Sequence, residues 1–385
     1  MNTDVPSVHS KLPDVGITIF SVMTRLAVEH GAINLAQGFP DFDCDPALIE
    51  AVAEHMRQGN NQYAPMQGIH ALREGLAAKI LALYGARYDP ETEITVTSGA
   101  TEAMFCAISA FVRPGDEVVL FEPCYDSYVP VVRLNGGVPV FVTLRYPHYV
   151  VDWDEVHAAL SPRTRMVIVN SPHNPSGTVF SAGDVERLAA LLDGTGVIVL
   201  SDEVYEHVVF DGLRHESLSR LPDLAARSCV VSSFGKTFHT TGWKVGYVSA
   251  PAPLTAEIRR VHQFVTFASH TPSQLAYAGF VRAPESYNQL GAFYQEKRDL
   301  FLRLVAASRF TPVPCKGTYF QLLDYSAITR AHDHDFALAL LREHGVASIP
   351  TSAFLYASQA PPVLRFCFAK REETLRHAAE RLSQV

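Results

Sequence analysis

A lysine between Val230 and Lys244 is the first residue in the chain with a clear chemical possibility. Lys236 follows two valines, two serines, a phenylalanine and a glycine, so it lies on a turn just after an apolar run. Its amine could be a surface charge, a ligand of a phosphate group, or an amine that forms a Schiff base with a carbonyl compound. Lys236 alone does not decide between these roles.

Other polar and aromatic residues follow apolar runs in the same way. Asp202 and Tyr205 come after the run Val197–Leu200, and Asn174 comes after Met166–Asn170. The acid could pair with a protonated ring nitrogen, and the hydroxyl and the amide could hydrogen-bond to a phenolic oxygen. Each residue taken singly is equally well explained as a cap, a core tyrosine or a turn residue. Their recurrence at the ends of apolar runs indicates one shared site.

A group that could bind an anion lies earlier in the chain. The stretch Ser98-Gly99-Ala100-Thr101 opens a predicted helix, and its small residues would let the backbone approach a ligand. The free N–H groups at a helix N-terminus favour phosphate, although an ordinary helix cap would look the same. Ser233 and Lys244 could add a hydroxyl and a charge. Tyr125 follows the run Val118–Phe121 and could stack on a planar ring.

The elements that must position these residues alternate along the chain. Short apolar runs are separated by helical patterns, and several runs are apolar at consecutive positions, as in strands covered on both faces. This alternation predicts a doubly wound, mostly parallel sheet, in which ligands bind beyond the carboxyl ends of the strands. The runs are Ile94–Thr97, Val118–Phe121, Val138–Val142, Met166–Asn170, Val197–Leu200, Cys229–Ser232 and Val245–Ser249.

One connection breaks this pattern. Too few residues separate Ser232 from Val245 for a crossover helix, so we predict that Val245–Ser249 runs antiparallel to the strand before it. Lys244 would then lie at the same end of the sheet as Lys236.

The predicted organisation is a large α/β domain and a smaller α+β domain. The large sheet domain is expected to span residues 46–280 and the small domain residues 281–385, with residues 1–45 packing against the small one. A long helix is predicted over Ala256–Phe280, bent near Pro272.

Composition limits the function. The chain has 385 residues, 48% hydrophobic and 19% charged, with a formal net charge of -8, which argues against nucleic acid and anionic membranes as partners. The six cysteines show no C-x-x-C pair, so we expect reduced core thiols. No signal peptide or membrane-spanning run is recognisable, so we expect a cytoplasmic protein.

The motifs together resemble the class I/II aminotransferases, which have the fold type I architecture of aspartate aminotransferase. Within that family the sequence is most similar to the branch of methionine aminotransferases and kynurenine aminotransferases or glutamine transaminases K. The motifs occur in the family order over nearly the whole chain. They are Asn34–Phe42, Asn61–Pro65, Thr97–Glu102, Glu122–Tyr128, Pro172–Gly177, Ser201–Tyr205, Ser232–Thr237, Thr241–Gly246 and Leu364–Phe368.

The resemblance implies that the site holds pyridoxal 5'-phosphate. Lys236 would form the Schiff base, Asp202 would pair with the ring nitrogen, and Asn174 and Tyr205 would bind the ring oxygen. Tyr125, where much of the branch has Phe, would stack on the ring. The phosphate would be bound by Ser98, Gly99, Ala100, Thr101, Ser233 and Lys244, and by Tyr63 of a neighbouring subunit in a homodimer with shared sites.

The resemblance also implies ping-pong transamination between an L-amino acid and a 2-oxo acid. Arg365, Asn174 and the Gly38 backbone would hold the substrate α-carboxylate. The amino acid would be methionine, glutamine or an aromatic one. Phe20 and Phe39 are candidate walls for its side chain, although they are equally plausible as core residues.

Three alternatives stay in view. The same scaffold could eliminate a thiol and act as a cysteine-S-conjugate β-lyase. A non-catalytic regulator would add a basic DNA-binding module, for which the roughly 30 residues before the first motif leave little room. The stretch His332-Asp-His-Asp335 could suggest a metal, but it lacks further ligands, so we expect no metal site and interpret it as a solvated helix start.

Overall fold

The computed structural model describes residues 8–385, and its largest element is a seven-stranded sheet. Strand β8 pairs antiparallel with both of its neighbours, and the other pairs are parallel. The predicted mostly parallel sheet with one antiparallel strand is therefore confirmed. The strands lie in the order β2 (Ile94–Thr97), β8 (Gly246–Ser249), β7 (Ser228–Ser233), β6 (Ile198–Asp202), β5 (Thr164–Asn170), β3 (Glu117–Glu122) and β4 (Val138–Thr143).

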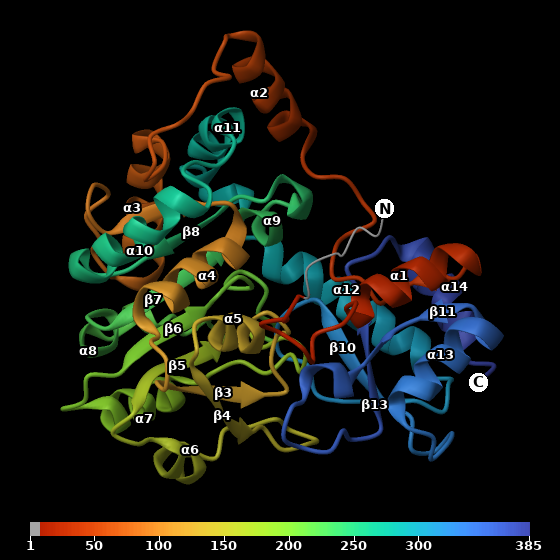
Figure 1. Ribbon diagram of the computed structural model, residues 1–385. Helices are drawn as coiled ribbons and strands as arrows, with labels where there is room; N and C mark the ends of the chain where they lie inside the picture. The colour runs from red at the N-terminus through yellow and green to blue at the C-terminus, as the bar shows by residue number, and fades with distance from the viewer. Residues whose placement is uncertain (1–7) are drawn as a thin grey trace, which may run out of the picture.

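Helices cover both faces of this sheet (Figure 1). Successive side chains of a strand point to opposite faces, and in β5 Met166 and Ile168 pack in one apolar cluster while Val167 and Val169 pack in another. The first cluster includes residues of α4 (Gly99–Phe111), α5 (Tyr128–Leu134) and α10 (Ala252–Val265), and the second those of α6 (Trp153–Ala159) and α7 (Ala182–Leu192). This double cover explains the continuous apolar runs in the sequence.

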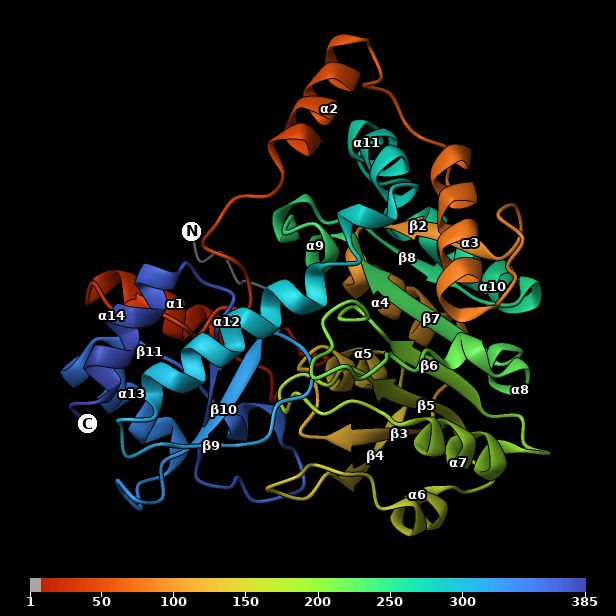
Figure 2. The same ribbon diagram turned by 180° about the vertical axis from the view of Figure 1, so that it is seen from behind.

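A third apolar cluster lies beside β2 and β8. It joins α2 (Pro46–Arg57), α3 (His70–Tyr84) and α11 (Thr271–Val281). Helix α2 lies at the apex of the molecule, beyond α11, in both ribbon views (Figures 1 and 2).

The single long helix predicted over Ala256–Phe280 is wrong. Helix α10 ends at Val265 and α11 begins at Thr271. Between them Phe267 has φ +70°, a left-handed value that an α-helix of L-residues does not allow. Pro272 occupies the first turn of α11, where its missing N–H interrupts no hydrogen bond. Two consecutive helices with apolar residues therefore gave one continuous pattern in the sequence.

The C-terminal residues form a second, four-stranded antiparallel sheet with three helices. Its strands are β12 (Ile349–Pro350), β13 (Val363–Cys367), β10 (Phe320–Asp324) and β9 (Thr311–Pro312), and its helices α12 (Leu290–Val305), α13 (Asp333–His344) and α14 (Glu372–Leu382).

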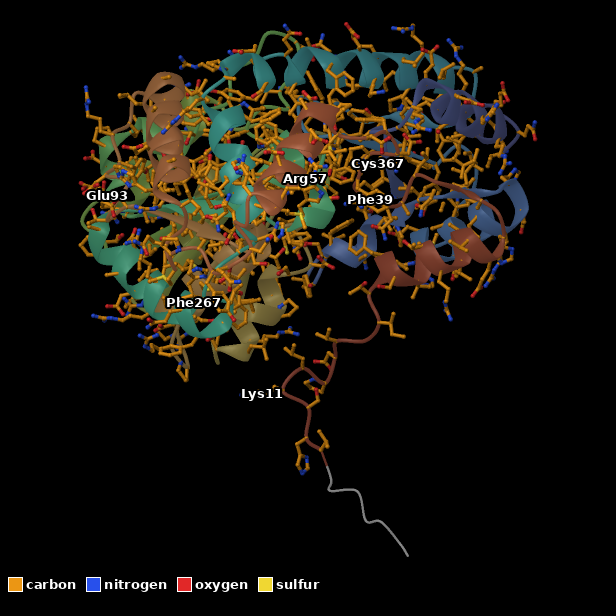
Figure 3. The ribbon with its side chains drawn as sticks, turned by 90° about the horizontal axis from the view of Figure 1, so that it is seen from above. Lys11, Phe39, Arg57, Glu93, Phe267 and Cys367 are labelled. Carbon is orange, nitrogen blue, oxygen red and sulfur yellow. The ribbon has the colours of Figure 1, made fainter. Side chains whose placement is uncertain are left out.

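The N-terminal part lies against this C-terminal unit. β1 (Ile33–Asn34) pairs in parallel with β11 (Val346–Ala347), and α1 (Ile19–Glu29) contacts β11 as well (Figure 2). The segment through Lys11 projects away from the body of the molecule (Figure 3). The division of the chain at residues 45 and 280 stays a prediction. No helix in residues 8–385 has the length and apolar character needed to cross a bilayer.

Candidate active site

A cavity of about 380 Å³ opens at the carboxyl ends of the parallel strands. This is the edge of an open α/β sheet where ligands bind. All but three of the residues predicted for the site line it. The lining residues among them are Phe20, Gly38, Gly99, Ala100, Thr101, Tyr125, Asn174, Asp202, Tyr205, Ser233, Lys236, Lys244 and Arg365.

Ser98, Phe39 and Tyr63 do not line this cavity. The backbone N–H of Ser98 donates to Glu102 Oε2 at 2.5 Å, and its side chain makes no capping bond. Phe39 is 44% exposed and lies under Lys370, whose Nζ is 5.0 Å from the ring centroid. Tyr63 is 85% exposed, with its ring edge-on to Phe267.

Lys236 lies in the one-turn helix α9 (Phe234–Thr237), directly after β7. Its Nζ donates to Tyr319 Oη at 2.8 Å and to Gly38 O at 3.3 Å. Burial lowers the pKa of Lys236 to about 8, and the positive charges of Arg365 and Lys244 act in the same direction. A sizeable fraction of this amine is therefore neutral near physiological pH, as a nucleophile requires.

The start of α4 and the start of β8 form a narrow cradle. A Cβ on Gly246 would lie 2.7 Å from the backbone N of Ala100, so only glycine permits this approach. Gly99 has φ +77°, and a Cβ there would lie 3.3 Å from Lys244 Nζ. Helix N–H groups and a lysine ammonium thus meet on one side of the cavity, an arrangement that suits a phosphate group.

Asp202 ends β6 at the base of the cavity. Tyr128 Oη donates to its Oδ2 at 2.6 Å, and the Val204 N–H donates to its Oδ1 at 3.3 Å. Burial raises the pKa of Asp202 to about 6, and the two hydrogen bonds oppose that shift. A buried carboxylate of this kind is stabilised by a cationic partner, such as a protonated ring nitrogen.

Arg365 reaches the cavity from β13, in the C-terminal sheet. Its Nη1 donates to Asn174 Oδ1 at 2.8 Å, and its Nη2 donates to Ala36 O at 3.0 Å. Because Oδ1 is the acceptor, the Asn174 amide nitrogen is left to donate elsewhere. Burial lowers the pKa of Arg365 to about 10, so it stays a cation at neutral pH.

Three aromatic rings surround this guanidinium. Its Cζ lies 3.9 Å from the ring centroid of Phe320, 5.0 Å from that of Phe354 and 5.2 Å from that of Phe20. The rings hold the planar group and exclude water from it, which strengthens its attraction for a carboxylate. Phe20 therefore contacts the arginine as well as lining the cavity.

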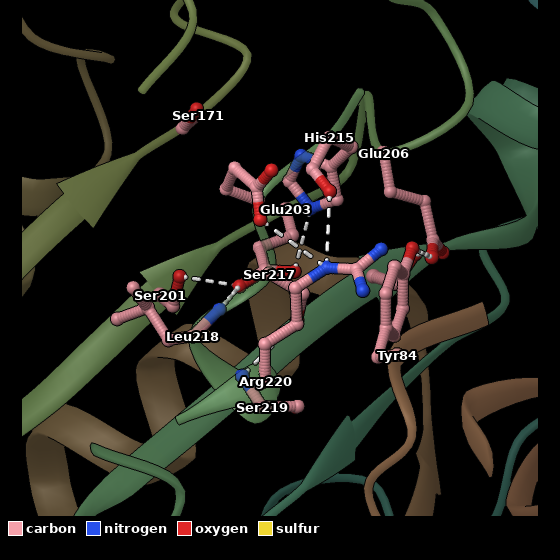
Figure 4. Close-up of polar contacts among 12 residues, drawn as sticks. Tyr84, Ser171, Ser201, Glu203, Glu206, His215, Ser217, Leu218, Ser219 and Arg220 are labelled. Atoms are coloured by element: carbon pink, nitrogen blue, oxygen red, sulfur yellow. Dashed lines mark hydrogen bonds and ion pairs between the residues drawn. The ribbon is translucent and has the colours of Figure 1, made fainter. Parts of the chain in front are cut away.

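Two more carboxylates of the same turn, Glu203 and Glu206, lie outside the cavity. Glu206 forms a cluster that we call the buried network, with Lys79, Tyr84, Ser232 and Tyr247. Glu206 accepts from Lys79 Nζ at 2.7 Å, and the three hydroxyls donate to it as well. Beside this network, Glu203 accepts from Ser201, His215 and the Leu218 N–H (Figure 4). Neither glutamate lines the cavity.

Sequence reasoning missed two tyrosines of the site. Tyr128 lies within the motif Glu122–Tyr128, three residues after Tyr125, and its place in that motif was a usable signal. Tyr319 bonds to Lys236 from the loop before β10, and no local pattern marked it.

The motif His332-Asp-His-Asp335 lies at the start of α13 and lines no part of the cavity. The His332 side chain accepts from the His334 N–H and so caps this helix.

Comparison with known proteins agrees with the chemistry of this cavity. Residues 30–382 match the family "Aminotransferase class I and II". The chain belongs to this aminotransferase family. It is 52% identical to the methionine aminotransferase of Escherichia coli (strain K12), over 98% of each chain, and 34% identical to human kynurenine–oxoglutarate transaminase 1, over 93% of each.

The fold of this aminotransferase is shared with solved relatives. A structure of an E. coli protein with a methionine aminotransferase function superposes with a TM-score of 0.97 and covers 99% of this chain and 100% of its own. These findings favour an enzyme of the transaminating type over the β-lyase and the regulator. Members of the family use pyridoxal phosphate and act on amino acids and 2-oxo acids.

Proposed function

We propose that this aminotransferase binds pyridoxal 5'-phosphate at Lys236 and uses methionine, glutamine or an aromatic L-amino acid as donor and a 2-oxo acid as acceptor. One observation carries the proposal: an amine with a lowered pKa, an anion cradle and a buried carboxylate line the same cavity. The relation to a methionine aminotransferase at 52% identity supports the choice of donor.

The residues present fit the cofactor. The cradle at Gly99–Thr101, with Ser233 and Lys244, would hold the phosphate. Asp202 would accept a bond from the protonated ring nitrogen, and Asn174 and Tyr205 would donate to the ring oxygen. Tyr125 is the aromatic residue placed to stack on the ring.

When bound, the cofactor supplies an electrophilic carbonyl carbon and an electron-withdrawing ring. Arg365 binds the substrate α-carboxylate through the guanidinium held by its three rings. Lys236, neutral in part because its pKa is low, takes the proton from the substrate α-carbon and returns it as a general acid. Asp202 keeps a proton on the ring nitrogen through a charge-assisted hydrogen bond.

The functional unit in this proposal is a cytoplasmic homodimer. The exposed ring of Tyr63, next to the exposed Phe267, supports a role across a subunit contact rather than in its own cavity. Five of the six cysteines are buried and all are free, which supports a reducing compartment. Sedimentation of the purified protein at several concentrations tests the dimer.

The visible absorption spectrum of the purified protein tests the function. We expect a yellow band that bleaches with L-methionine and returns when a 2-oxo acid is added, with L-aspartate as the control. A colourless protein that cannot be reconstituted with pyridoxal phosphate would contradict the proposal. Release of pyruvate and ammonia from cysteine conjugates, without bleaching by methionine, would support the β-lyase instead.

A further inference from the structure

Asp126 lies in the cavity beside Tyr125 and has no assigned role. It belongs to the turn between β3 and α5, is half-buried, and lines the same cavity as Arg365. Within residues 8–385, no other residue donates a hydrogen bond to its carboxylate. Burial raises the pKa of Asp126, and the charge of Arg365 opposes that shift, so the two groups face each other electrostatically.

The neighbouring acid on the same strand end differs. Glu122 Oε2 accepts from the backbone N–H groups of Tyr356 and Ala357, at 2.8 and 3.1 Å, and Ser358 donates to its other oxygen. That carboxylate is used to fix the loop after the helical turn Thr351–Phe354. Asp126 fixes no loop of this kind, so its charge acts within the cavity, on Arg365 and on any ligand that enters.

The charged groups that line the cavity determine how a charged substrate side chain would be received. The cations that line it are Lys236, Lys244 and Arg365. In the proposed function these three serve the cofactor carbonyl, the phosphate and the substrate α-carboxylate. A second carboxylate, on a substrate side chain, would find no further cation among the lining residues of the same subunit and would face a like charge.

We propose that Asp126 is a specificity-determining residue that disfavours amino acids and 2-oxo acids with a second carboxylate and so selects uncharged side chains. The inference rests on the proposed function, because it takes Arg365 as the binding group for the α-carboxylate. An aspartate stays ionised at neutral pH unless its pKa rises by about three units. Two carboxylates about 6 Å apart at the edge of a protein cavity repel enough to weaken binding roughly ten- to hundredfold.

Two ligands of equal chain length test this inference without turnover. Pentanoate has one carboxylate and glutarate has two, and their affinities for the cofactor-loaded protein can be measured by calorimetry. We expect the wild type to bind pentanoate at least about tenfold more tightly than glutarate. Asp126→Asn, which keeps the shape and removes the charge, should bring the ratio close to one.

Three further variants complete the test. Asp126→Glu retains the charge and should retain the preference. Asp335→Asn removes the same charge from an acid whose side chain is 76% exposed on α13, and should leave the ratio unchanged. Asp126→Ser provides a second uncharged variant if the asparagine fails to fold.

The inference would be overturned if Asp126→Asn and Asp126→Ser kept the wild-type ratio of pentanoate to glutarate affinity. It would also be overturned if the wild type bound glutarate as tightly as pentanoate. Absence of binding by both ligands would overturn it too, since Arg365 would then hold no carboxylate. The proposed function is tested separately, by bleaching of the yellow band with methionine. The role of Asp126 and the proposed function can therefore fail independently of each other.

Discussion

Asp202 and Glu206 are buried acids of the same turn, yet their environments shift their pKa values in opposite directions. Asp202 faces the cavity, and burial raises its pKa to about 6. Burial alone would raise the pKa of Glu206 as well, but Lys79 at 2.7 Å and the Ser232 hydroxyl hold that pKa well below its usual range. The protein supplies a cation to one carboxylate and leaves the other to a ligand.

This difference in pKa shift distinguishes charges that stabilise the fold from charges that are available to a ligand. The buried network is complete within the chain, because each oxygen of Glu206 accepts hydrogen bonds and Lys79 balances its charge. The cavity groups point at a space of about 380 Å³, and their charges are balanced only when a cofactor and a substrate arrive. Substitutions in the two regions should therefore affect different measurements.

The largest expected effect concerns Lys236. Lys236→Ala should lower turnover by about 10²–10⁴-fold, because the amine that moves the proton is lost. Cofactor binding should be retained through the phosphate cradle, and the free energy of unfolding should change little. Steady-state kinetics measures the turnover, and urea denaturation measures the free energy of unfolding. Substantial transamination by this variant would refute the role of Lys236.

The second comparison uses the two acids. Glu206→Gln leaves Lys79 charged and buried without its partner, so we expect the free energy of unfolding to fall by about 3–5 kcal/mol. Asp202→Asn should instead lower turnover with little loss of stability. The double variant Glu206→Gln, Lys79→Met should recover part of the stability. Equal stability of both acid variants in urea would remove the distinction between the regions.

A smaller effect is expected for Arg365→Lys. A lysine cannot match a carboxylate with two parallel N–H bonds, and it would lose the contact with the three rings. We expect kcat/KM for methionine to fall about ten- to hundredfold, the cost of losing a charge-assisted bond. Near-wild-type kinetics would show that another group binds the α-carboxylate.

The smallest effect concerns pH. The pKa of Lys236 is lowered to about 8, so its amine is mostly protonated below that value and mostly neutral above it. Capture of pyridoxal phosphate by the cofactor-free protein should therefore become about tenfold faster between pH 7 and pH 9. Stopped-flow absorbance measures this rate. A rate that stays flat over this range would mean that deprotonation of Lys236 does not limit capture.

Much of the fold could be predicted because the relevant signals are local. The bounds predicted for β2, Ile94–Thr97, agree with the structure, since this short run consists entirely of β-branched residues. The antiparallel direction of β8 followed from the length of one connection. The two-residue strands β1 and β11 had no usable pattern, because their pairing joins segments more than 300 residues apart in the chain.

Site residues that follow parallel strands could be predicted from the sequence, whereas those that come from other parts of the chain could not. Asp202, Asn174 and Lys236 were found because a parallel sheet brings its strand ends together. Tyr319, which bonds to Lys236, and Phe320, which lines the cavity, could not be found this way, since they come from the antiparallel C-terminal sheet and its preceding loop. The resemblance located Arg365, but its contacts with three aromatic rings required the structure.

The partners of Arg365 also determine when its site can form during translation. Its guanidinium joins Ala36 near the N-terminus, Asn174 in the middle and its own strand β13 near the C-terminus. During translation the phosphate cradle and Lys236 emerge from the ribosome well before residue 365. We therefore expect a nascent chain to become competent for cofactor before it can select an amino acid, with substrate recognition the last property acquired.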